Sequence, residues 1–291
     1  MAYMKKRSKL PILYALAQCV LYPILFYVVR YRRKMVRHNM SLAFPEASEK
    51  ELRALEKKFY HWFCDLFAEI IYGGSISAEE MVARVTHPNK EETYELIRKH
   101  GGALMILGHL GCWEWLADIG NRYPEDIHSY VIFRKQKNQW VDQLMHRLRE
   151  KRGCEPIDKN VLLRHMVLNR KKEGAQVYFL ISDQKPSKND LGHWTTFLHQ
   201  ETPFITGTET LARKFGYPVF YVDVEMSERG HYSTMFELIA ENVAETPEGY
   251  VTDRFAQLLE ANILRKPEIW LWSHNRFKWK REDAVKLKIE S

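Results

Sequence analysis

Short apolar runs alternate with helix-like segments over most of the chain, and this alternation constrains the fold more than any other feature. The runs LMIL, YVIF and VYFLI occupy residues 104–107, 130–133 and 177–181. Amphipathic segments lie between them near residues 113–119 and 139–151. Such alternation is typical of α/β proteins with parallel strands. We therefore expect a mixed, largely parallel central sheet flanked by helices.

Further elements extend this pattern on both sides. Upstream, Ser48 and Glu51 form an S-x-x-E capping box that predicts the start of a helix, and Gly73-Gly74 predicts its end. Downstream, we expect three more strands and two helices: VFYVDV at 219–224, TMFELI at 234–239 and IWLW at 269–272, with helices around 208–215 and 252–264. No fixed-period repeat or flexible linker interrupts the pattern, so residues 39–291 are predicted to form one domain.

Residues 10–29 contain no charged side chain, and basic residues flank them on both sides. About 20 apolar residues suffice to span a bilayer, but Pro11 and Pro23 shorten the uninterrupted helical stretch. Spanning and lying in the interface both remain open, and a buried core helix is a third possibility. A secretory signal is a competing interpretation, but the segment lacks the small-x-small cleavage site that such a signal carries. We predict a helical membrane anchor over residues 1–38, held by its basic flanks on an anionic leaflet.

Composition narrows the classes of partner and cofactor. The chain has 44 Lys+Arg against 37 Asp+Glu, and its net charge of +7 favours anionic partners. Its four cysteines form no CxxC pair and have no histidine nearby at metal-ligand spacing. We therefore expect no disulfide framework, no metal and no cofactor, and a reducing compartment.

The sharpest local motif is GHLGCWE at residues 108–114, placed where a predicted strand ends and a helix begins. Ligands of open α/β sheets bind at such strand ends, next to helix N-termini. If the glycines fold the turn tightly, Glu114 can approach His109, fix its tautomer and leave the second ring nitrogen to take a proton from a hydroxyl. The alternative is a surface histidine followed by a glutamate that the helix dipole favours.

With these neighbours, the motif resembles the late (secondary) acyltransferases of lipid A biosynthesis, members of the lysophospholipid acyltransferase-like superfamily with the signature H-x4-D/E. Similar segments follow in order along the chain: RHNMSLAFP at 37–45, FRKQKN at 133–138, SDQKPS at 182–187, GTETLARK at 207–214 and PEIWLWSHNRFKWKR at 267–281. The resemblance implies an enzyme at the cytoplasmic face of a Gram-negative inner membrane. It would move a fatty acyl group from acyl carrier protein, or a similar thioester, to a glycolipid hydroxyl. His109 would be the base and Glu114 its partner, without an acyl-enzyme.

Other residues are candidates for substrate binding. Arg134 could grip a lipid A phosphate or the phosphopantetheine of the carrier, because guanidinium binds phosphate bidentately. Asp183 and Gln184 follow a predicted strand end, and we expect them to position the substrate rather than transfer a proton. Arg164 could contact lipid headgroups. The basic tail could do the same or form a solvated face: Arg276, Lys278, Lys280 and Arg281.

Two further patterns leave their role open. Gly207, Thr208 and Glu209 begin a predicted helix whose free N–H groups could bind an anion, although Thr208 could equally serve as its N-cap. Tryptophans alternate with the basic tail at positions 270, 272 and 279. That spacing suits a membrane-interface belt and a single-strand nucleic-acid site alike.

Three function classes follow from these observations. The leading hypothesis is a membrane-bound O-acyltransferase, which needs no nucleic acid. The second is a non-catalytic basic protein that binds membranes or nucleic acid. The third, a serine hydrolase, lacks the G-x-S-x-G motif. Related families acylate phosphatidylinositol mannosides or aminolipids, so the acceptor and the acyl chain length stay open.

Overall fold

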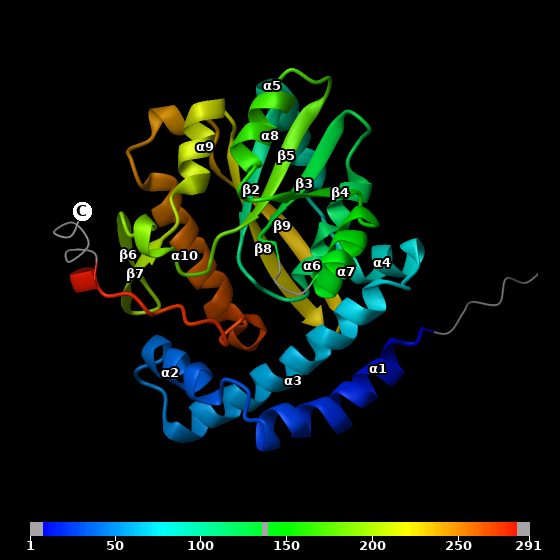
Figure 1. Cartoon of the computed structure of the whole chain (residues 1–291), viewed down its shortest axis with the longest axis vertical. Coiled ribbons are helices and arrows are strands. Elements are labelled where there is room, and N and C mark those ends of the chain that lie inside the picture. The colour runs from blue at the N-terminus through cyan, green and yellow to red at the C-terminus, as the bar shows by residue number, and fades with distance from the viewer. Residues whose placement is uncertain (1–7, 136–138, 284–291) are drawn as a thin grey trace, which may run out of the picture.

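A seven-stranded sheet in the order β1-β9-β8-β2-β5-β3-β4 forms the centre of the computed structural model, which describes residues 8–135 and 139–283 (Figure 1). Among the described strand pairs of this sheet, only β8–β9 is antiparallel. The strands are β1 Val85–Thr86, β2 Gly102–Leu107, β3 Ile127–Phe133, β4 Cys154–Asp158, β5 Ala175–Ile181, β8 Val219–Glu228 and β9 His231–Ala240. The expected mixed, largely parallel sheet is confirmed.

Helices cover the sheet, which explains why its central strands read as continuous apolar runs. All six residues of β2 are buried. The helices after α3, Glu49–Gly73, are α4 Ala78–Arg84, α5 Tyr94–His100, α6 Trp113–Leu116, α7 Gln139–Glu150, α8 Leu162–Asn169, α9 Gly207–Phe215 and α10 Tyr250–Arg265, with 3-10 turns at η3 Lys90–Thr93, η4 Ala117–Arg122, η5 Lys188–Asp190, η6 Val243–Glu245 and η7 Pro267–Ile269. A separate hairpin pairs β6 His193–Phe197 with β7 Gln200–Phe204.

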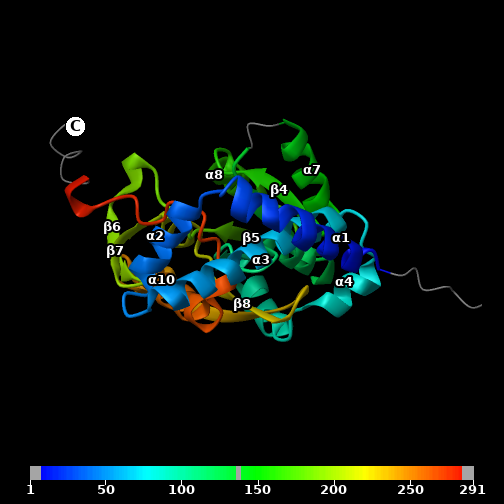
Figure 2. The ribbon, with the colours of Figure 1, turned by 90° about the horizontal axis from the view of Figure 1, so that it is seen from below.

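The long helix α3, Glu49–Gly73, begins at the predicted capping box. The Ser48 hydroxyl accepts a hydrogen bond from the backbone N–H of Glu51, and the Glu51 carboxylate accepts one from that of Ser48. The helix ends at Gly73, as expected. Figure 1 shows α3 below the sheet, with α1 and α2 beside it; Figure 2, seen from below, shows these three helices side by side.

The N-terminal segment is one helix built from α1 Leu10–Leu16 and two π-helical stretches, η1 Ala17–Leu21 and η2 Ile24–Val28. Pro11 lies in the first turn, and Pro23 lies between the π-helical stretches, where wider turns accommodate its missing N–H. By length and composition, residues 10–28 could cross a membrane, and 22% of their most apolar window is buried in the protein. The next helix, α2, is Arg33–Ala43.

One face of the N-terminal helix, residues 10–28, is bound to α3, and the other face is exposed. The Tyr14 hydroxyl donates to the Glu69 carboxylate over 2.7 Å, and the Gln18 amide donates to Asp65 over 2.6 Å. The exposed face carries an apolar stripe at four-residue spacing: Ile12, Leu16, Val20 and Ile24. The basic residues 5–7, and residues 136–138 of FRKQKN, lie outside the described residues.

The tail differs from expectation. Residues 269–272 do not form a strand; a 3-10 turn precedes Trp270, which makes a single bridge to Leu110. Trp270 and Trp272 are buried, so neither belongs to a membrane belt or a nucleic-acid surface. The run is apolar because it fills the core. The sequence reasoning also missed β4, whose sequence CEPID contains charges and proline, as an edge strand allows.

Candidate active site

His109 and Asp183 meet because β2 and β5 are neighbours in register. Leu107 pairs with Ile181 at the carboxyl ends of these parallel strands, so the two following loops emerge at the same edge of the sheet. His109 Nδ1 lies 2.6 Å from Asp183 Oδ1. The other carboxylate oxygen accepts from the backbone N–H of His109 and from the indole of Trp270, both over 2.8 Å. Asp183 thus fixes the histidine by both main chain and side chain.

These contacts decide the state of the pair. Burial by itself raises the pKa of Asp183, but the charge of His109 and the hydrogen bonds of His109 and Trp270 outweigh it and bring the pKa to about 2. An ionised carboxylate only accepts hydrogen bonds, so Nδ1 carries a proton, and whenever the ring is neutral Nε2 is the nitrogen that can accept one. The His109 side chain keeps 16% of its surface exposed against 3% for Asp183. Gln184, the next residue, places its amide nitrogen 3.4 Å from Nε2.

Glu114 has a different partner from the expected one. Its carboxylate accepts two hydrogen bonds from Arg149 of α7, over 2.9 and 2.7 Å. Among the described residues, no hydrogen bond or ion pair joins Glu114 to His109. The expected hydrogen-bonded pair of His109 and Glu114 is therefore absent from the described structure, and Asp183 contacts His109 instead. The turn of GHLGCWE directs Glu114 toward α7, whereas the strand register delivers Asp183 to the imidazole.

A third carboxylate, Glu69 of α3, lies behind the motif, and the sequence analysis missed it. It accepts hydrogen bonds from the hydroxyls of Tyr14 and Tyr232 over 2.7 and 2.8 Å, and its backbone carbonyl accepts from the Trp115 indole over 2.9 Å. Burial, opposed by the tyrosine hydrogen bonds, raises its pKa to about 7. Glu69 thus links the N-terminal helix to the His109 loop. A glutamate inside the apolar run FAEII was the available signal.

Basic side chains lie next to Gln184, and we call them the cationic rim: Lys185, Lys278 and Arg134. The ammonium of Lys185 lies over the Trp279 ring at 5.4 Å, and that of Lys278 lies over the same ring at 4.3 Å. Desolvation, and the charges of Lys278 and Arg134, lower the pKa of Lys185. The charge of Arg134, just after β3, thus acts on Lys185 as well. Basic side chains that influence one another in this way favour an anion.

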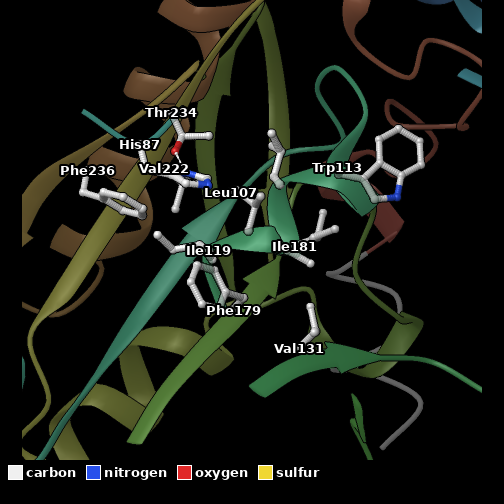
Figure 3. Close-up of a pocket in the computed structure, with 12 residues that line it drawn as sticks. His87, Leu107, Trp113, Ile119, Val131, Phe179, Ile181, Val222, Thr234 and Phe236 are labelled. Atoms are coloured by element: carbon white, nitrogen blue, oxygen red, sulfur yellow. Dashed lines mark hydrogen bonds between the residues drawn. The ribbon is translucent and has the colours of Figure 1, made fainter. Parts of the chain in front are cut away.

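A narrow apolar cavity lies next to Trp113, a neighbour of His109 (Figure 3). Trp113 stands at one side and meets the His109 ring edge to face, with ring centres 4.9 Å apart. The other lining residues come from five strands of the sheet, from η4 and α6, and from the loop after β1: His87, Leu107, Leu116, Ala117, Ile119, Val131, Phe179, Ile181, Val222, Thr234 and Phe236. The cavity lining is therefore almost wholly apolar, and Trp113 connects it to the imidazole of His109.

The structure brings several other candidates no closer to His109. Thr206, not Thr208, is the N-cap of α9. Glu209 is buried and binds the backbone N–H groups of Gly249 and Thr252, so its carboxylate caps α10. No hydrogen bond or ion pair among the described residues joins Gly207, Thr208, Glu209 or Arg164 to His109. Arg164 is exposed on α8.

The basic tail is divided between core and surface. Arg276 is fully buried against the rings of Phe204 and Phe197 and donates to the Pro203 carbonyl over 2.9 Å, so it cannot contact a headgroup. Arg281 pairs with Glu201 at the surface. Within residues 8–135 and 139–283, no group of three His, Cys, Asp or Glu side chains could hold a metal ion.

Comparison with known proteins identifies the family. Residues 7–279 match the family model described as bacterial lipid A biosynthesis acyltransferase. The chain belongs to this family. It is therefore an acyltransferase that works with an acyl donor and a lipid acceptor, and its family is membrane-associated in bacteria. A search of curated proteins gives no match.

Proposed function

We propose that this acyltransferase moves a fatty acyl group from acyl carrier protein, or a similar thioester, to a hydroxyl of a lipid A precursor or related glycolipid. The observation that carries the proposal is the imidazole of His109, fixed by an ionised carboxylate and in contact with Trp113, which lines an apolar cavity. A base next to an acyl-chain site, with no activated nucleophile of its own, suits transfer to a hydroxyl that the substrate supplies.

The reaction then follows from the two residues. Nε2 of His109 takes the proton of the acceptor hydroxyl while its oxygen attacks the thioester carbonyl carbon. The tetrahedral intermediate collapses, the carbon–sulfur bond breaks, and the thiolate takes the proton from the imidazolium. Asp183 stabilises that imidazolium and holds its tautomer. The products are the glycolipid ester and the carrier thiol.

An acyl-enzyme is not needed. Cys112 is the cysteine nearest His109 in the sequence, but its side chain is buried, and burial together with the charge of Glu69 holds its pKa well above the ordinary value. A thiol in that state is a poor nucleophile. The acyl group therefore passes directly from donor to acceptor.

Glu114 acts in this proposal as a positioning residue. Its ion pair with Arg149 holds α7 against the turn that carries His109, and Arg149 in turn lies over the Phe133 ring at 5.5 Å. Phe133 ends β3, immediately before Arg134 of the cationic rim. The pair would thus keep the rim and the histidine in one arrangement.

The cationic rim would bind the phosphate that both substrates carry, either the lipid A phosphate or the phosphopantetheine of the carrier. Arg134, Lys185 and Lys278 supply the charge, and Lys185 directly follows Asp183 and Gln184 in the chain. A rim of this kind positions the reacting groups next to Nε2. Gly207, Thr208, Glu209 and Arg164 stay candidates for more distant substrate contacts.

The N-terminal anchor, residues 1–38, would lie in the interface of the inner membrane on its cytoplasmic face. The polar contacts of Tyr14 and Gln18 tie it lengthwise to α3, so α1 cannot cross the bilayer without carrying α3 with it. Its apolar stripe faces outward, and Phe67 and Ile71 of α3 expose further apolar surface. The flanking residues Arg30 and Lys34 suit an anionic leaflet.

The test uses the purified full-length protein in vesicles with acyl carrier protein thioester and a lipid A precursor. We expect thiol release and a lipid product heavier by one acyl group. Thiol release without an acylated lipid would make the protein a hydrolase, and no release would leave a binding protein. Acylation of an aminolipid or of a phosphatidylinositol mannoside, but not of the precursor, would replace the acceptor.

A further inference from the structure

The β9 end of the apolar cavity holds an imidazole nitrogen without a partner. His87, which follows β1, keeps 6% of its surface exposed, and its Nδ1 lies 2.6 Å from the Thr234 hydroxyl. Its Nε2 is buried and has no hydrogen-bond partner within the described part of the chain. Figure 3 shows His87 and Thr234 on the opposite side of the cavity from Trp113. Buried polar groups almost always have partners, so this nitrogen points to a ligand.

A buried water explains it poorly. Water in a protein interior forms about three hydrogen bonds to polar groups. Apart from His87, Thr234 and the distant Trp113 indole, the cavity lining is apolar. A ligand that satisfies Nε2 is therefore one that is apolar over most of its length and brings its own oxygen.

The charge state of His87 narrows that oxygen to a hydroxyl. Burial, and then the charges of Arg122 and Lys90, lower the pKa of His87 to about 3, so the ring is neutral at neutral pH. One nitrogen of a neutral imidazole donates and the other accepts, and the Thr234 hydroxyl can serve either role. Nε2 can thus accept from a hydroxyl or donate to one. A neutral ring carries no positive charge that would attract a carboxylate.

We propose that His87 is a specificity residue that selects acyl chains bearing a hydroxyl group, an inference that rests on the proposed function. The hydroxyl lies well along the chain. His109 follows β2, and Thr234, the hydrogen-bond partner of His87, is on β9, two strand spacings or about 10 Å away. Each carbon–carbon bond of about 1.5 Å advances an extended zigzag chain by roughly 1.25 Å, so about eight bonds cover that distance. The selected hydroxyl is therefore at mid-chain, not next to the carboxyl group.

The test compares carrier thioesters of dodecanoic acid that are unsubstituted or hydroxylated near the carboxyl end, at mid-chain or at the methyl end. For the wild-type protein we expect kcat/KM to favour the mid-chain hydroxyl by about tenfold or more over the plain chain. His87→Phe keeps a ring of similar size without nitrogens and should abolish the preference. His87→Gln, whose amide can reach the place of Nε2, should restore part of it. Thr234→Val is the matched control, because it removes the partner of Nδ1 but keeps Nε2.

A binding measurement separates this inference from the proposed function. A fluorescent fatty acid is displaced from the His109→Ala protein, with and without His87→Phe, by dodecanoic acid and its mid-chain hydroxy derivative. If thioesters are transferred but plain and hydroxylated chains react equally, the inference fails and the function stands. If nothing is transferred but the hydroxy acid displaces the probe better only when His87 is present, the function fails and the inference stands. Equal displacement with both proteins overturns the inference.

Discussion

Two carboxylates approach the His109 turn from different regions of the molecule and end in different partnerships. Asp183, 74 residues away, comes from the neighbouring strand and binds the imidazole; Glu114, five positions away in the same motif, binds Arg149 of α7. Sequence proximity thus did not decide which carboxylate reaches the histidine. The register of β2 and β5 did, because it fixes two loop starts at one edge of a rigid sheet.

Replacing the histidine should give the largest effect. His109→Ala removes the base that both arrangements share, and we expect kcat to fall by about two to four decades while lipid binding is kept. Thiol release from the carrier thioester measures the rate, and vesicle flotation measures the binding. Near wild-type turnover would show that His109 is not the catalytic base, and the choice of its carboxylate partner would then not matter for the reaction.

Asp183→Asn tests the strand-delivered carboxylate. The amide can donate to Nδ1 and stabilise the wrong tautomer, so we expect kcat to fall by about a hundredfold or more with KM little changed. Glu114→Gln is the matched change in the other region and should lower kcat far less. If the two effects are reversed, Glu114 is the partner of His109 in the working enzyme and the resting arrangement differs from it.

Glu114→Gln should act on stability instead. It leaves the largely buried Arg149 guanidinium without its counter-charge, and loss of one partner of a buried pair costs about 3–5 kcal/mol. Exposure of 15% of the Arg149 side chain reduces that figure, so we expect a loss of about 2 kcal/mol in urea unfolding. The double variant Glu114→Gln with Arg149→Met should recover most of it. A stable single variant would show that the pair holds nothing in place.

Glu69, the third carboxylate near the His109 turn, should make the stability of the protein depend on pH. The carboxylate of Glu69 is hydrogen-bonded by two tyrosine hydroxyls, and burial raises its pKa from 4.5 to about 7 in the folded protein. Between these values the folded chain binds more protons than the unfolded one, so its contribution to stability is complete below about pH 4.5 and is lost as the pH rises to about 7. Relative to Glu69→Gln, the wild-type protein should lose on the order of 3 kcal/mol across this window. Parallel stability curves for the two proteins would contradict the assignment.

Chelation should give the smallest effect. Among the described residues, neither Asp183 nor Glu114 belongs to a group of three His, Cys, Asp or Glu side chains that could hold a metal ion. A catalytic base with an ionised partner requires no metal. We expect unchanged turnover after treatment with EDTA. Activity lost on chelation and regained with zinc would contradict this expectation.

The sequence alone determined most of the main elements and the family. Apolar runs specified β2 and β5 because these strands are buried on both faces, and Ser48, Glu51 and Gly73 specified α3 because caps and stops are local. The motif around His109, and the ordered segments from residue 37 to the tail, gave the resemblance that the family model confirms. All of these signals act over a few residues, so one chain displays them without its fold.

Tertiary structure decided the partners. Whether a carboxylate meets an imidazole, a guanidinium or two tyrosines depends on which strands are neighbours and in what register, and side-chain types at a given spacing do not encode that. The apolar run at Trp270 and Trp272 illustrates the same limit, because a periodic pattern does not distinguish a strand from a tail that fills the core. The unpartnered nitrogen of His87 is likewise a product of the fold, since burial is a property of the assembled fold and not of the residue.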